Sequence, residues 1–195
     1  MWIGTTTDGA YRLQLDKNEL THPILKGNIT SIYQDSEGEL WIGSWEEGLH
    51  HVKTDGTIEI FEYDAKNPYS ISSNFVRACC EDNLGNIWIG TFNGLNRYDK
   101  STGLFQNHTA SDAQSDGLTH SSIWCIVKDN QGTLWLGTYF GGVNYFNPEY
   151  EIYTRYKVGD TEKEGLSSPI VGRMTEDKDG NLWICTEGGL SLIHI

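Results

Sequence analysis

Residues Glu81–Thr91 read EDNLGNIWIGT, and the landmarks of this segment recur along the chain. An Asp-x-x-Gly turn comes first, and a Trp-Ile-Gly-Thr motif follows it. The motif or a close variant occurs five times: Trp2-Ile3-Gly4-Thr5, Trp41-Ile42-Gly43-Ser44, Trp88-Ile89-Gly90-Thr91, Trp135-Leu136-Gly137-Thr138 and Trp183-Ile184-Cys185-Thr186. Its tryptophans are 39, 47, 47 and 48 residues apart, so the chain is a series of repeats of one unit.

Two further landmarks accompany the motif. The turn precedes it at Asp35–Gly38, Asp82–Gly85, Asp129–Gly132 and Asp177–Gly180. In such a turn the aspartate carboxylate caps the backbone, and the glycine takes a positive φ. A glycine followed by an apolar residue comes after the motif at Gly48-Leu49, Gly94-Leu95, Gly142-Val143 and Gly189-Leu190. The pattern predicts a β-hairpin followed by further strands in every repeat.

Each repeat is expected to hold four short strands, with the motif tryptophan as a buried wedge. Burial of a tryptophan removes about 150–250 Å² from water, worth roughly 4–6 kcal/mol as an upper bound. A four-stranded unit cannot bury both faces alone, and stacking such units around an axis gives a β-propeller. A solenoid is the alternative, but its repeats are usually shorter or helical. The fold class is therefore all-β, an incomplete propeller arc of about four to five four-stranded blades.

The segments Glu81–Thr91, Gly94–Asp99 and Leu134–Asn144 resemble the two-component regulator propeller repeat, and Asn67–Asn74 is similar to the connector that precedes a new blade in that family. Cys185 departs from it, because the family has glycine at this position. The resemblance implies the periplasmic sensor region of a hybrid two-component histidine kinase anchored in the inner membrane. The implied ligands are oligosaccharides that control polysaccharide-utilisation genes. Any kinase activity belongs to the parent protein, which is membrane-anchored and could be a dimer, and this fragment is not expected to be an enzyme.

Both ends of the chain are expected to be cut. The chain opens at a second-strand motif and closes in a third strand, so residues 1–190 are expected to form a partial propeller with incomplete first and last blades. Residues 191–195 are expected to be a non-native tail. The last six residues, LSLIHI, are the translation of CTG TCT CTT ATA CAC ATC, a transposon end used in sequencing-library preparation. Leu190 fits the repeat, and a natural apolar third strand is the alternative.

The composition disfavours several partners. The chain carries 27 acidic and 14 basic residues, a net charge of −13 that repels phosphate backbones, so no nucleic-acid partner is expected. No metal or cofactor is expected, because the adjacent pair His50-His51 diverges in a strand. Cys79, Cys80, Cys125 and Cys185 have no Cys-x-x-Cys spacing and are expected to act as small strand hydrophobes.

Ligand-binding residues are expected where the repeats differ. The connectors after the motif, Trp45-Glu46-Glu47, Phe92-Asn93 and Tyr139-Phe140-Gly141, should open on one rim of the propeller. The inner strands begin with Thr30, Arg77, Trp124 and Gly172 at one register near the channel mouth. Aromatic faces stack on sugar rings, and polar groups meet hydroxyls or acidic substituents. The candidates are Trp45, Glu46, Arg77, Phe92, Asn93, Trp124, Tyr139 and Phe140.

Within this set, Arg77 would favour an acidic sugar. The competing interpretation is that the rim aromatics merely pack between blades. Two other functions remain open beside ligand sensing: a protein-interaction scaffold, and a propeller lyase. A lyase would need a base and a metal gathered from several blades, and no histidine recurs at a channel-facing position of the repeats. The chain also lacks the Gly-x-Ser-x-Gly and His-Glu-x-x-His motifs of common hydrolases.

Overall fold

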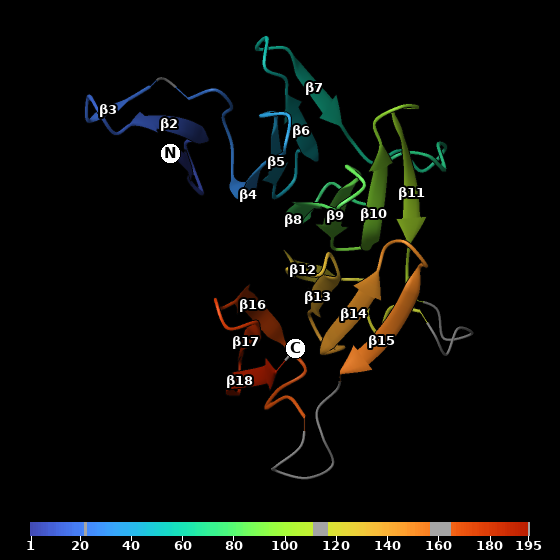
Figure 1. The fold of residues 1–195 in the computed structure, drawn as a ribbon. Helices are drawn as coiled ribbons and strands as arrows, with labels where there is room; N and C mark the ends of the chain where they lie inside the picture. The colour runs from blue at the N-terminus through green and yellow to red at the C-terminus, as the bar shows by residue number, and fades with distance from the viewer. Residues whose placement is uncertain (22, 111–116, 157–164, 195) are drawn as a thin grey trace.

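The computed structural model describes residues 1–21, 23–110, 117–156 and 165–194, and these residues form strands and turns with no helix. The strands make five antiparallel sheets that follow one another along the chain. The sheets are arranged as an open arc (Figure 1). The expected all-β propeller arc is therefore confirmed. No helix among the described residues could span a lipid bilayer.

Three sheets are complete four-stranded blades, and the strand order within each follows the sequence. Their strands are β4 (Ile29–Gln34), β5 (Leu40–Ser44), β6 (Leu49–Val52) and β7 (Ile58–Phe61); β8 (Val76–Glu81), β9 (Ile87–Thr91), β10 (Gly94–Asp99) and β11 (Leu104–His108); and β12 (Ile123–Lys128), β13 (Leu134–Thr138), β14 (Val143–Asn147) and β15 (Ile152–Tyr156).

The first and last sheets have three strands each, as the phase of the repeat predicts. They are β1 (Trp2–Gly4), β2 (Ala10–Gln14) and β3 (Glu19–Leu20), and β16 (Val171–Glu176), β17 (Asn181–Thr186) and β18 (Gly189–His194). Strands β4, β8, β12 and β16 lie along the concave side of the arc (Figure 1). Ser191–His194 of the expected tail belong to β18 and pair with β17, and Ile195 lies outside the described residues. A non-native origin of residues 191–195 stays a prediction.

The Asp-x-x-Gly turns have the predicted chemistry. Asp82 Oδ1 accepts the backbone N–H groups of Leu84 at 2.8 Å and Asn86 at 2.9 Å. Gly85 has a φ of +82°, a conformation that a side chain would strain. The Asp82 carboxylate and the glycine conformation therefore close the turn that joins β8 to β9.

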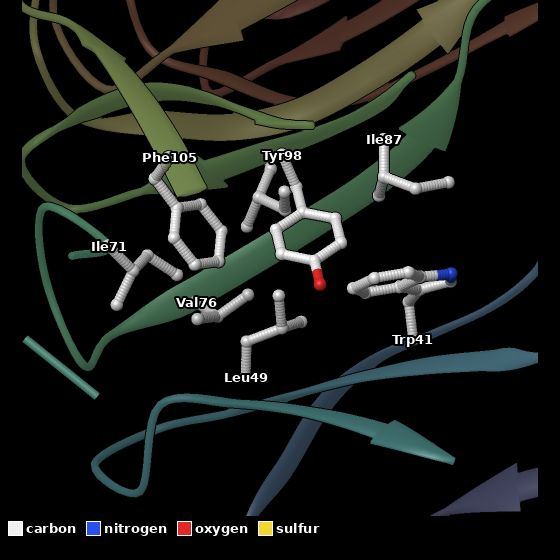
Figure 2. Packing of buried hydrophobic residues seen from close by; sticks show 8 residues of the cluster. Trp41, Leu49, Ile71, Val76, Ile87, Tyr98 and Phe105 are labelled. Atoms are coloured by element: carbon white, nitrogen blue, oxygen red, sulfur yellow. The ribbon is translucent and has the colours of Figure 1, made fainter. Parts of the chain in front are cut away.

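The core lies between the blades rather than within one. The side chains of Trp41, Trp88 and Trp135 are 0%, 0% and 2% exposed, which confirms them as wedges. Figure 2 shows Trp41 and Leu49 of one blade pointing at Val76, Ile87, Tyr98 and Phe105 of the next. Trp88 and Trp135 occupy equivalent clusters further along the arc.

The glycine of the motif allows the next blade to approach. A Cβ added to Gly90 would lie 2.8 Å from Ile123 Cγ2, where β12 of the next blade begins. Gly43 faces Val76 and Gly137 faces Val171 in the same way, since an added Cβ would lie 2.7 and 2.6 Å from the respective valine Cγ1. The glycine therefore admits the branched first residue of the neighbouring inner strand.

Three of the four cysteines behave as the small hydrophobes expected. All four are free thiols, and Cys79 and Cys80 pack into different inter-blade clusters. Burial raises the pKa of the Cys79 thiol to about 12 and that of Cys80 to about 11. Cys185 differs because it is exposed on the open face of the last sheet. Cys185 therefore does not pack as a small hydrophobe, because no described blade covers its side chain.

Candidate functional site

One backbone hydrogen bond recurs in the blades and builds a common rim. The residue that follows each motif donates its N–H to the carbonyl of the residue just before the inner strand. These bonds run from Trp45 to Asn28 (3.0 Å), from Phe92 to Phe75 (3.1 Å), from Tyr139 to Ser122 (3.1 Å) and from Glu187 to Ile170 (3.2 Å). The bond places Trp45, Phe92 and Tyr139 at one level of three neighbouring blades.

A β-bulge recurs one residue into each inner strand. The pairing of β8 with β9 passes from Val76↔Thr91 to Ala78↔Gly90 and leaves Arg77 out. The pairings of the other inner strands skip Thr30, Trp124 and Gly172 in the same way. A bulge redirects the side chain of the extra residue. The common register predicted for these four positions is confirmed, but the predicted strand starts are wrong by one residue, because each inner strand begins just before its bulge, at Ile29, Val76, Ile123 and Val171.

The rim and bulge residues meet in one cluster. The guanidinium carbon of Arg77 lies 5.2 Å from the ring centroid of Trp45 and 4.5 Å from that of Trp124. The Trp124 ring stacks on Tyr139 with centroids 4.7 Å apart and planes 17° apart. We call Trp45, Arg77, Trp124 and Tyr139 the rim cluster. It draws on three blades and is held together by cation–π and stacking contacts.

Further aromatic side chains extend the rim cluster at both ends. The Trp45 ring lies 5.8 Å from Phe92 and 5.6 Å from Phe75, and Tyr139 lies 4.2 Å from Phe140. Phe92 is 38% exposed and Phe140 is 54% exposed, so each end presents an apolar face to solvent. The structure thus brings together six of the eight candidates.

Glu46 and Asn93 are not part of the cluster. Asn93 Nδ2 donates to the carbonyl of Ser72 at 3.4 Å, a contact within its own blade. Glu46 is exposed, and within the described ranges it has no hydrogen-bond or ion-pair partner. Trp124 is also less open than expected, because both Arg77 and Tyr139 contact its ring. The polar groups expected beside the aromatics are therefore absent from this cluster, apart from Arg77 and the Tyr139 hydroxyl.

Two contributors were missed by sequence reasoning. Phe75 contacts both Trp45 and Phe92, and His120 lies 6.2 Å from Phe140. Both belong to the connectors that enter an inner strand. The signal for Phe75 was present in the repeat, because the equivalent positions are Asn28, Ser122 and Ile170 and only this one is aromatic.

A cavity lies beside the rim cluster, between the inner strands. It has a volume of about 180 Å³ and is lined by residues of β4, β8, β12 and β16. Arg77 and Trp124 belong to both the cluster and the cavity wall, and Arg173 is also in the wall. Burial and the charge of Arg173 both lower the pKa of Arg77. The site therefore combines exposed apolar faces with concentrated positive charge.

Acidic side chains gather at the other end of β5, around the turn that precedes Trp41. Asp35, Glu37 and Glu39 lie close together there. Lys100 Nζ lies 3.2 Å from both Asp35 and Glu37, and Asp35 also accepts the indole N–H of Trp41. These bonds tie the group into the contact between two blades, which is a structural role.

The family of the Two component regulator propeller matches the chain at four places, residues 23–46, 70–93, 117–140 and 165–188. Each match runs from a blade connector through the inner strand and its turn to the rim. The matched stretches include all four residues of the rim cluster.

Two solved extracellular domains of hybrid two-component systems from B. thetaiotaomicron are similar over almost the whole chain. BT3049 gives a TM-score of 0.77 at 25% identity, covering 98% of this chain and 24% of that domain. BT4673 gives a TM-score of 0.79 at 25% identity, covering 98% of this chain and 25% of that domain. The chain therefore spans about a quarter of the length of each.

The fold is shared more widely. Virginiamycin B lyase from Staphylococcus aureus gives a TM-score of 0.71 at 16% identity, covering 100% of this chain and 66% of the lyase. At this identity the likeness shows the propeller fold alone. No curated protein sequence is recognisably similar to the chain.

Proposed function

The chain belongs to the two-component regulator propeller family, and from this premise we propose that it is part of the extracytoplasmic sensor of a hybrid two-component system. The rim cluster is proposed to recognise an oligosaccharide. The parent protein would be anchored in the inner membrane and would use this signal to control polysaccharide-utilisation genes. The fragment itself binds, and the kinase lies elsewhere in the parent.

The observation that carries the proposal is the rim cluster itself. Trp45, Arg77 and Trp124 are contributed by three different blades, yet their rings and guanidinium contact one another. The repeat does not require these residues, since Thr30 and Gly172 occupy the bulge position of Arg77 and Trp124 in other blades. On a rigid repeated scaffold, binding residues usually lie in the connecting loops, where the side chains differ from repeat to repeat.

The chemistry of the rim suits a saccharide. Phe92 and Phe140 offer exposed apolar faces, which the C–H face of a pyranose ring can cover. The Arg77 guanidinium and the Tyr139 hydroxyl can donate hydrogen bonds to ring substituents. Ligand sites commonly combine mainly apolar walls with a few polar groups that fix orientation.

A lyase receives less support from the same positions. The bulge residues of the four inner strands are threonine, arginine, tryptophan and glycine. None of these is a histidine or a carboxylate, which are the side chains that most often serve as a general base. A protein-binding scaffold remains the second candidate, because exposed aromatic residues also mark protein interfaces.

The test is a binding measurement on the purified chain against a panel of plant and host oligosaccharides, by calorimetry and tryptophan fluorescence. Phe140→Ala and Tyr139→Ala should weaken binding, whereas Tyr150→Ala should not. Tyr150 is a fair control because it is 65% exposed but lies in the turn between β14 and β15, at the other end of the blade. Equal affinities in all three variants would refute the assignment of the site.

A further inference from the structure

The cavity beside the rim cluster has an unusual charge. Its wall contains Arg77 from β8 and Arg173 from β16, and it contains no aspartate or glutamate. The whole chain has nearly twice as many acidic as basic residues, 27 against 14. The inner strands thus bring two positive charges to one cavity, open to solvent, on an acidic protein.

Neither arginine is neutralised within the part of the chain that the structure describes. Arg77 and Arg173 have no hydrogen bond and no ion pair there, whereas Arg97 lies 3.8 Å from a carboxylate oxygen of Glu151. The two guanidinium groups also repel each other, and burial together with this repulsion lowers the pKa of Arg77. Arg77 is partly buried, and an unpaired charge in such a place is unfavourable unless a counter-ion compensates it, whereas Arg173 is exposed.

Arg77 is also held in place. Its guanidinium lies over the rings of both Trp45 and Trp124, and no hydrogen bond among the described residues occupies its N–H donors. The planar guanidinium can therefore offer two parallel hydrogen bonds to a carboxylate or a sulfate. The buried indole Nε1 of Trp124, in the same wall, also has no acceptor among the described residues.

We propose that this cavity binds the anionic substituent, a carboxylate or sulfate group, of the saccharide recognised by the rim cluster, with Arg77 and Arg173 as its two cationic ligands. This inference rests on the proposed function and narrows it to acidic saccharides. Because Arg77 and Trp124 belong to both the rim cluster and the cavity wall, one ligand can contact both regions.

The experiment compares acidic and neutral ligands of similar size on the purified chain. The probes are trigalacturonic acid, neutral galactotriose, a sulfated disaccharide and inorganic sulfate, and the variants are Arg77→Gln and Arg173→Gln. The control is Arg12→Gln. Arg12 lies 5.6 Å above the Trp2 ring and, like Arg77, has no ion pair in the described ranges, but it lies outside the cavity.

At least one acidic saccharide should bind about tenfold or more tightly than galactotriose, and either cavity variant should weaken that binding by about 10–100-fold. The affinity should fall as salt is added, because salt screens the attraction between the anionic ligand and the two arginines. The Arg12 variant should match the unmodified protein. Comparing trigalacturonic acid with the sulfated disaccharide identifies which anion the cavity prefers.

Thermal melts of every variant test folding. Because Arg173 is exposed, replacing it carries a low risk of disturbing the fold.

Two outcomes separate this inference from the proposed function. If galactotriose binds as tightly as both acidic saccharides and still depends on Tyr139 and Phe140, the anion site is refuted while the rim function stands. If an acidic saccharide binds through Arg77 and Arg173 but its affinity does not depend on Tyr139 and Phe140, the anion site stands and the rim function fails. If no anionic probe binds at millimolar concentration, the anion site is refuted.

Discussion

The Asp82 carboxylate accepts the indole N–H of Trp88 at 2.8 Å while its other oxygen caps the turn between β8 and β9. The same pair recurs at Asp35–Trp41 (3.0 Å), Asp129–Trp135 (2.9 Å) and Asp177–Trp183 (2.8 Å). One side chain therefore joins the turn to the inter-blade wedge. This double role explains why the aspartate and the tryptophan stay six residues apart in the four repeats that have both.

Replacing Trp88 by alanine should lower the free energy of unfolding by about 3–5 kcal/mol, the range for a large truncation in a core. Trp183→Ala is the matched control, because it removes the same hydrogen bond from a side chain that is 36% exposed. Trp183→Ala should lower the free energy of unfolding clearly less than Trp88→Ala does. Urea titrations followed by circular dichroism measure both, and equal costs would show that burial between blades is not the main contribution.

The stability should depend on pH through Asp177. Hydrogen bonds from the Asn181 backbone, the Trp183 indole and the Asn181 side chain lower the pKa of Asp177 from 3.8 to about 2. A group whose pKa is lower in the folded state stabilises the fold above its unfolded pKa. This contribution is therefore complete above about pH 4 and is lost as the pH falls toward about 2.

Asp177→Asn removes this titration. The variant should be less stable than the unmodified protein near neutral pH, and the difference should shrink between about pH 4 and pH 2. Chemical denaturation at a series of pH values measures it. A difference that stays constant across this range would mean that the Asp177 charge does not contribute.

Gly90→Ala should destabilise the contact between two blades. The new Cβ would lie 2.8 Å from Ile123 Cγ2, and overpacking of this kind costs about 1–3 kcal/mol. Adding Ile123→Ala should recover part of the loss, and the double-mutant cycle measures the coupling. Gly172→Ala is the control, since its Cβ would meet nothing closer than 3.7 Å. Equal effects at both glycines would indicate a general effect of strand propensity rather than a clash.

The sequence predicted what each blade does by itself, because local rules determine it. The turn at Asp82, the wedge at Trp88 and the register that Arg77 shares with its equivalents all follow from the repeat, whereas the bulge at Arg77 was not predicted. Contacts between blades were harder to predict. Arg77 meets Trp45 and Trp124 across blade boundaries, and those meetings depend on how the blades are stacked and on side-chain rotamers.

The position of Arg173 is a second feature that the sequence did not predict. Its repeat equivalents are Ser31, Ala78 and Cys125, all small, so the arginine stands out in the repeat. Its partner across the cavity, Arg77, is 96 positions earlier in the chain, and no local pattern connects the two. The rim was thus predictable as a location, and the charge of the cavity was not.

Substitutions in the rim should separate ligand binding from stability. Phe140 is 54% exposed, so Phe140→Ala should change the free energy of unfolding by about 0.5 kcal/mol or less, roughly 1–2 °C in Tm. If its face stacks on a sugar, affinity should still fall about tenfold. Trp124→Ala should reduce both quantities, because its ring contacts Arg77 and Tyr139. Paired melts and calorimetry on both variants measure this, and a large drop in Tm for Phe140→Ala would reveal a packing residue instead of a ligand contact.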